Sequence, residues 1–105
     1  MATYCVTFRI ADKTVGGKSY ADRRQSLIDN TRTDDLGYWD EPTSFLLVES
    51  GLDTTRFAKK ACAGLSVADD LLFVFDPSDR SACYFGAVES VDVLRSFFRQ
   101  LKKVP

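Results

Sequence analysis

Apolar and polar side chains alternate over residues 3–10. Tyr4, Val6 and Phe8 fall on one side of this segment, and Arg9 falls on the other. A period of two over eight residues is the pattern of a strand with one buried face. We therefore predict that the chain begins with a half-buried β-strand.

Two later segments are apolar at every position. Residues 45–48 and 71–75 predict strands that are covered on both faces. Residues 76–79 read Asp-Pro-Ser-Asp, a strong turn signal, so residues 82–88 are the predicted hairpin partner of the second run. Residues 37–39 predict a further short strand.

Three segments show helical spacing. The first is predicted from Ser19, with Asp22 completing a capping box, to about Asn30. The second begins at Asp53, a good N-cap, and ends near Gly64. The third begins at Ser90 and runs to the C-terminal region. The side chains expected on the inner faces of these helices are Tyr20, Ala21, Arg24, Leu27 and Ile28; Phe57, Ala58, Ala61, Cys62 and Leu65; and Leu94, Phe97, Phe98 and Leu101.

This order of elements predicts an α+β fold. The first six elements read β-α-β-β-α-β, the ferredoxin-like arrangement, and a C-terminal hairpin strand and helix follow. No linker or repeat divides residues 1–105, so we predict a single domain. The helices would cover one sheet face, and strands without a polar face need cover on the other face too. The last helix or a second copy could supply it, and we expect a homodimer.

The composition excludes several kinds of chemistry. The 105 residues include no histidine, which removes Ser-His-Asp and Cys-His hydrolases. Cys5, Cys62 and Cys83 have no metal-ligand spacing and are interpreted as reduced, which predicts a cytoplasmic protein. No apolar run approaches the roughly 20 residues of a membrane span. We expect no metal, no cofactor and no membrane partner.

The net charge is −1, yet the basic residues are unevenly distributed. Residues 1–33 carry six basic and three acidic side chains. The candidate nucleic-acid-binding residues are Arg9, Lys13, Lys18, Arg23 and Arg24. The alternatives are a solvated helix face for the last four and, for Arg9, a sheet-surface or dimer-interface position paired with an acid. The macrodipole of the last helix explains Arg95, Arg99, Lys102 and Lys103 without a ligand.

Two further groups of side chains have a structural and a functional interpretation. Trp39, beside Asp40 and Glu41, is predicted in the core under the helices, with an interface anchor as the alternative. The paired Asp69–Asp70 and the turn residues of 76–79 resemble metal ligands. Local hydrogen bonds to the backbone explain these aspartates better.

The order and spacing of the strand motifs resemble a group of small ferredoxin-like proteins. The motifs are Thr3–Ile10 with its aromatic-x-Ile ending, Gly37–Trp39 leading to Thr43–Val48, and Asp69–Val74. The group includes small CRISPR-associated endoribonucleases, virulence-associated protein D, SinR-like proteins and the endoribonuclease antitoxin of type V toxin–antitoxin systems. The resemblance covers residues 3–76 and implies the fold and a dimer.

The resemblance also implies a catalytic aspartate at the end of the first strand. In active members this carboxylate and its copy across the dimer hold a divalent ion. Arg9 stands at that position here and would repel a cation. We therefore expect a non-catalytic nucleic-acid- or protein-binding module. The alternatives are a divalent-metal-dependent endoribonuclease that uses Asp12, and a dimerisation or sensing module that binds no RNA or DNA.

Overall fold

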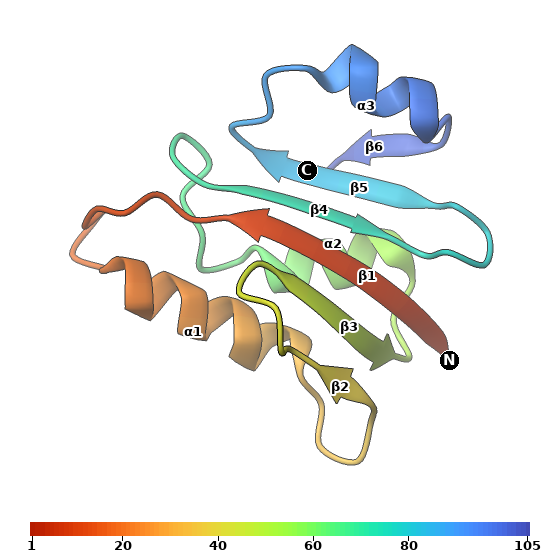
Figure 1. Cartoon of the computed structure of the whole chain (residues 1–105), viewed down its shortest axis with the longest axis horizontal. Helices are drawn as coiled ribbons and strands as arrows, with labels where there is room; N and C mark the ends of the chain where they lie inside the picture. The colour runs from red at the N-terminus through yellow and green to blue at the C-terminus, as the bar shows by residue number, and fades with distance from the viewer.

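The computed structural model describes residues 1–105 as one six-stranded sheet with three helices (Figure 1). The strand order is β2-β3-β1-β4-β5-β6, and every neighbouring pair is antiparallel except β5 and β6. None of the helices is long and apolar enough to cross a membrane. The elements are β1 (Ala2–Arg9), α1 (Tyr20–Thr31), β2 (Tyr38–Trp39), β3 (Phe45–Ser50), α2 (Thr54–Ala61), β4 (Leu71–Phe75), β5 (Ala82–Gly86), α3 (Val91–Phe97) and β6 (Leu101–Lys103).

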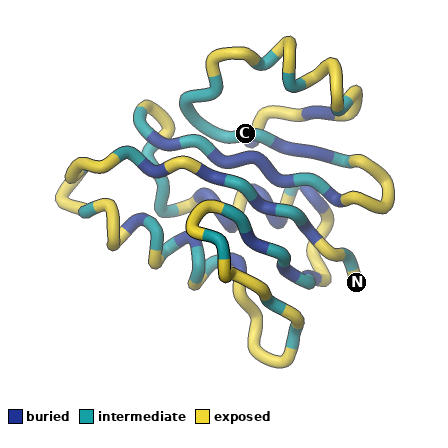
Figure 2. The backbone as a smooth tube through the Cα atoms, viewed as in Figure 1, coloured by how far each residue is buried: buried dark blue, intermediate teal, exposed yellow.

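The main core lies between the sheet and the pair of helices α1 and α2. Tyr4, Val6 and Phe8 of β1 are buried there, as their alternation predicts. The Tyr4 ring stacks on Phe57 of α2 with centroids 4.4 Å apart. The buried segments of β1, β3 and β4 run through the centre of the molecule in Figure 2. We call this side of the sheet the helix face.

A smaller apolar cluster lies on the opposite side of the sheet. Phe73, Ala82 and Leu101 are buried in it, and Leu94 and Phe98 pack against them. Phe73 is opposite Thr7 in the β1–β4 register, so it points away from the core that contains Val6 and Phe8. Leu94 of α3 and Phe98 after it therefore pack on the far side of the β4–β5–β6 end of the sheet.

Two of the three helix starts follow the predicted capping chemistry. The Ser19 hydroxyl accepts the Asp22 N–H at 3.1 Å, and the Asp22 carboxylate accepts the Ser19 N–H at 3.0 Å. The Asp53 carboxylate accepts the Arg56 N–H at 2.8 Å at the start of α2. The N-cap predictions for Ser19 and Asp53 are confirmed, whereas Ser90 precedes α3 but its side chain makes no capping hydrogen bond.

The C-terminal region differs from its prediction. The last helix ends at Phe97, and Phe98 is extended with φ −132°. Leu101 therefore lies in β6, where it is opposite Ala82 in a parallel pairing, and not on the helix. The hairpin strand β5 stops at Gly86, whose φ of 86° ends the extended conformation. The sequence does not predict β6, because a strand of three residues has too few positions to show the alternation of apolar and polar side chains.

Candidate functional site

One part of the sheet has no helix over it. This open face lies opposite α1 and α2, over β2, β3, β1 and the adjoining part of β4. The register of the strands identifies the residues on this face, because side chains opposite each other in an antiparallel pair point to the same side of the sheet. The open face consists of Thr3, Cys5, Thr7, Arg9, Trp39, Phe45, Leu47, Glu49, Leu71 and Phe75.

A continuous row of apolar side chains crosses the open face. Trp39 is opposite Leu47, Leu47 is opposite Cys5, and Cys5 is opposite Phe75. This apolar row contains one residue from each of four strands and no polar group other than the Cys5 thiol and the indole N–H. Trp39 is 42% exposed, and its ring centroid lies 6.4 Å from that of Phe45 in an edge-to-face contact. Exposure of such an apolar row to water is unfavourable, and a partner that covered the row would remove this unfavourable exposure.

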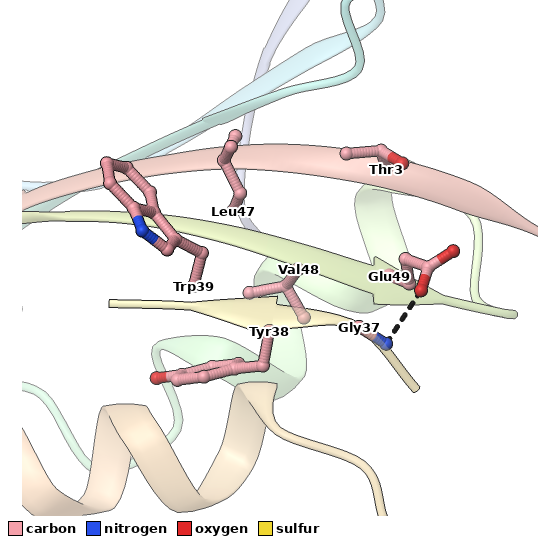
Figure 3. A pocket seen from close by; sticks show the side chains of 7 residues that line it. All are labelled: Thr3, Gly37, Tyr38, Trp39, Leu47, Val48 and Glu49. Carbon is pink, nitrogen blue, oxygen red and sulfur yellow. Dashed lines mark hydrogen bonds between the residues drawn. The ribbon is translucent and has the colours of Figure 1, made fainter. Parts of the chain in front are cut away.

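The predicted position of Trp39 in the core is wrong. Tyr38 and Trp39 are neighbours on β2, so their side chains lie on opposite faces of the sheet (Figure 3). Tyr38 is opposite the buried Val48, so it takes the helix face and leaves Trp39 on the open face. Leu46 and Val48 alternate with Leu47, so the sequence indicates which face of β3 is buried. It does not indicate which residue of β2 lies on that face, because a two-residue strand is too short to show alternation.

Charge is confined to two ends of the open face. Arg9 ends β1 at one end, and Glu49 is opposite Thr3 at the other. The Glu49 carboxylate accepts the Gly37 N–H at 2.7 Å and joins the start of β2 to β3 (Figure 3). Beside it lies a hollow of about 200 Å³ whose lining includes Thr3, Trp39, Leu47 and Glu49.

Arg23, one of the predicted nucleic-acid-binding residues, is buried. Its side chain is 1% exposed, and its Nε donates to the Asp70 carboxylate at 2.9 Å. The guanidinium also donates to the backbone carbonyls of Lys13 and Lys18 at 2.8 Å and of Ala11 at 2.8 Å. No donor remains free for a phosphate, so Arg23 is withdrawn as a surface contact.

The helical spacing of α1 held a signal for this burial. Arg23, Leu27 and Thr31 recur every four residues and are the buried residues of α1. The predicted inner face contains Tyr20 and Arg24 instead, and this prediction is wrong for Tyr20, which is 39% exposed. Arg23 can be buried because its charge is paired with Asp70, which lies 47 positions away. Helical spacing alone does not reveal this partner.

The other basic candidates are spread over the loop 11–19 and α1. Lys13 forms an ion pair with Asp69 at 2.6 Å. Arg24 donates to the Thr43 carbonyl at 3.2 Å and lies 5.9 Å from the Phe8 ring centroid. Arg9 and Lys18 are exposed and make no side-chain hydrogen bond or ion pair. Among the five basic candidates, these two have free charged groups.

The aspartates at strand ends are acceptors for nearby backbone and hydroxyl groups. Asp70 accepts the N–H groups of Ala11 at 2.9 Å and Ser66 at 2.8 Å. Asp76 accepts the Ser78 N–H and hydroxyl at 2.8 Å. The predicted local hydrogen bonds are confirmed for Asp76, whereas Asp70 also accepts from distant groups, the Ala11 N–H and the buried Arg23 side chain. No three Cys, Asp or Glu side chains are grouped so that they could hold a metal ion.

The three thiols are held in their neutral form. Burial raises the pKa of Cys62 and of Cys83, both on the helix-face side of the molecule. Burial is also the main cause that raises the pKa of Cys5 on the open face. A raised pKa lowers the thiolate fraction at neutral pH, so none of the three is an activated nucleophile.

No protein-family model matches this chain, and neither curated proteins nor solved structures give a match.

Breaking the buried ion pair is expected to destabilise the fold strongly. Replacing Arg23 by Met (Arg23→Met) leaves the Asp70 carboxylate buried without its charged partner, a change that typically costs about 3–5 kcal/mol. Urea denaturation followed by circular dichroism measures the free energy of unfolding. Lys13→Ala, which breaks an exposed ion pair, is the control and should shift the midpoint little. Equal shifts for the two variants would contradict the structural role of Arg23.

The pKa of Asp69 reports whether Lys13 is engaged. The Lys13 ammonium, followed by the Ser66 hydroxyl, lowers the pKa of Asp69 below its usual 3.8. A carboxyl group whose pKa is lower in the folded than in the unfolded protein stabilises the fold at pH values above the pKa of the unfolded state. This contribution is lost as the pH falls through the pKa of the folded state. Carbon-detected NMR should show the pKa of Asp69 rising in Lys13→Ala. The pKa of Asp22, lowered by Ser19, should stay unchanged. An unshifted Asp69 would mean that Lys13 is free in solution.

Proposed function

We propose that this protein is a small non-catalytic binding module that acts as a homodimer, with the open face of each copy covered by the other. The apolar row is the observation that carries this proposal. Its Trp39, Leu47, Cys5 and Phe75 side chains cross four strands, and on that side the C-terminal segment packs only on the β4–β5–β6 end, where Phe98 contacts Phe75. A second copy offers a surface of the same shape and the same apolar character.

We further propose that the first six elements form the ferredoxin-like arrangement. The order β2-β3-β1-β4, with antiparallel neighbours, supports it. The same order supports the resemblance to the small CRISPR-associated and SinR-like proteins. Arg9 at the end of β1 supports a role without metal-dependent cleavage, since its positive charge would repel a divalent cation.

A charge in the apolar row should separate the copies. Leu47→Glu would bury an uncompensated carboxylate in the interface, and we expect the dimer dissociation constant to rise at least 100-fold, about 2.7 kcal/mol. Sedimentation velocity over a concentration series measures it. Ala63→Glu, at an exposed position after α2, is the matched control and should leave the dimer intact. A wild-type chain that stays monomeric at every concentration would refute the dimer.

Nucleic acid is a second candidate partner, favoured by the free charges of Arg9 and Lys18. We expect weak, salt-dependent binding of single-stranded RNA, because only two of the five candidate residues have free charged groups and the net charge of the chain is −1. Fluorescence anisotropy at two salt concentrations measures it. Arg9→Ala should reduce the salt slope by about 1, and Lys59→Ala on α2 should not.

The same titration separates this candidate from its alternatives. RNA cleavage that needs magnesium and is lost in Asp12→Ala would favour the endoribonuclease. Salt-independent absence of binding would leave a dimerisation or sensing module.

A further inference from the structure

We infer that residues 91–105 form a strap that opens as one unit while the rest of the molecule stays folded. The strap consists of α3, Phe98 and β6, and its hinge is at residues 88–90. When closed, it packs on Phe73 and Phe75 of β4 and pairs with the outer edge of β5. The motion takes place within one copy and does not depend on the proposed dimer.

The strap is attached by few buried side chains. Of the 24 buried residues in the chain, only Leu101 and Val104 belong to it. No residue of α3 is buried, and Figure 2 shows this helix as exposed and intermediate positions at the margin of the molecule. Burial of apolar surface is the main favourable contribution to folding, so the strap is held less strongly than the sheet with α1 and α2.

The elements of the strap have little stability of their own. With seven residues, α3 is shorter than the roughly 12–15 residues at which an isolated helix becomes marginally stable. Three residues of β6 pair with β5, and β6 has no strand on its other side, whereas β4 is paired over five residues on each side. Because α3 and β6 both depend on contacts with the sheet, we expect them to lose their structure together.

The hinge comes directly after a fixed point of the chain. The Ala87 N–H donates to the Asp70 carbonyl at 2.9 Å, and Gly86 lies so close to that carbonyl that a Cβ there would collide with it. Residues 86 and 87 are therefore held beside the start of β4. Glu89 and Ser90 are exposed, and the Ser90 side chain makes no capping hydrogen bond. The chain is thus free to change direction between Ala87 and α3.

The β4–β5 turn supplies a latch for the strap. The Arg80 guanidinium donates to the Phe97 carbonyl at the end of α3, and it lies 4.8 Å from the Phe98 ring centroid. The Gln100 side chain donates to the Asp79 carbonyl at 3.1 Å. Arg80 therefore satisfies a carbonyl that the end of the helix leaves without a partner, and it holds the aromatic ring that covers β4.

Opening changes the surface that the sheet presents. In the closed state the Phe98 ring lies 5.0 Å from the rings of both Phe73 and Phe75. Once the strap opens, both of these rings are accessible from the far side of the sheet. The strand β5 also becomes an edge strand, whose outward N–H and C=O groups are free to pair. The strap therefore controls access to the β4 end of the apolar row and to the edge of β5.

Amide hydrogen exchange followed by NMR tests the strap in the unmodified chain. The Phe98 N–H donates to the Leu94 carbonyl at 3.2 Å, and the Val104 N–H donates to the Tyr84 carbonyl at 2.9 Å. We expect these two amides to share one protection factor, at least 100-fold lower than that of the most protected amides of β1. The Ala87 amide, before the hinge, should be protected more strongly than both.

Replacing Arg80 by glycine removes the latch without straining the turn, because Arg80 already has a φ of 62°. In Arg80→Gly we expect the exchange of Phe98 and Val104 to become at least 10-fold faster, with β1 unchanged. The matched control is Asp35→Gly. Asp35 has a φ of 71° and is exposed in the loop before β2, at the opposite edge of the sheet from the strap. This variant should leave the exchange of the strap unchanged.

The outcomes are distinct. One protection factor for the strap and β1 would mean that the strap opens only when the whole molecule unfolds, and it would overturn the inference. Faster exchange at Phe98 than at Val104 would mean that α3 frays by itself, which also overturns it, as does exchange of Ala87 together with the strap. An unchanged rate in Arg80→Gly would remove the latch. Sedimentation velocity of the same samples reports on the proposed dimer separately, so its failure leaves the strap standing.

Discussion

The Arg23 guanidinium organises one end of the molecule. It lies on α1, and its hydrogen bonds reach three carbonyls of the loop 11–18 and the carboxylate of Asp70 ahead of β4. Asp70 in turn accepts N–H groups from Ala11 and from Ser66 after α2. Burying two charges is costly, and the fold offsets that cost by satisfying both sets of polar atoms. The path of the chain from β1 to α1, and from α2 to β4, depends on this pair.

The same constraint shapes the surface where a ligand could bind. The charge of Arg23 is buried in the fold, so it is not available to a ligand at the surface. The charge of Lys13 is partly neutralised by Asp69. Arg9 and Lys18 keep free charged groups, so the basic surface is smaller than a count of lysines and arginines indicates. The open face then becomes the most distinctive surface, and its apolar row is better suited to another protein surface than to phosphates.

The C-terminal region divides the far side of the sheet into a covered and an uncovered part. β6 extends the sheet beside β5, and Val104 reaches the main core on the helix face. The Phe98 ring packs on β4, with its ring centroid 5.0 Å from those of both Phe73 and Phe75. The C-terminal segment packs on the β4–β5–β6 end of the sheet, so the part over β2, β3 and β1 is left without a helix on that side. The proposed dimer is argued from this uncovered part.

Local pattern determined most of the secondary structure. The alternation in β1, the apolar runs of β3 and β4, and the caps Ser19 and Asp53 each depend on neighbouring residues, so the sequence predicts them. The burial of Arg23, the exposure of Trp39 and the pairing of β6 were decided only by tertiary structure. Arg23 needed a carboxylate 47 residues away, Trp39 needed the register of β2 against β3, and β6 needed a parallel neighbour to pair with. These contacts join segments that are distant in the chain, and no local period records them.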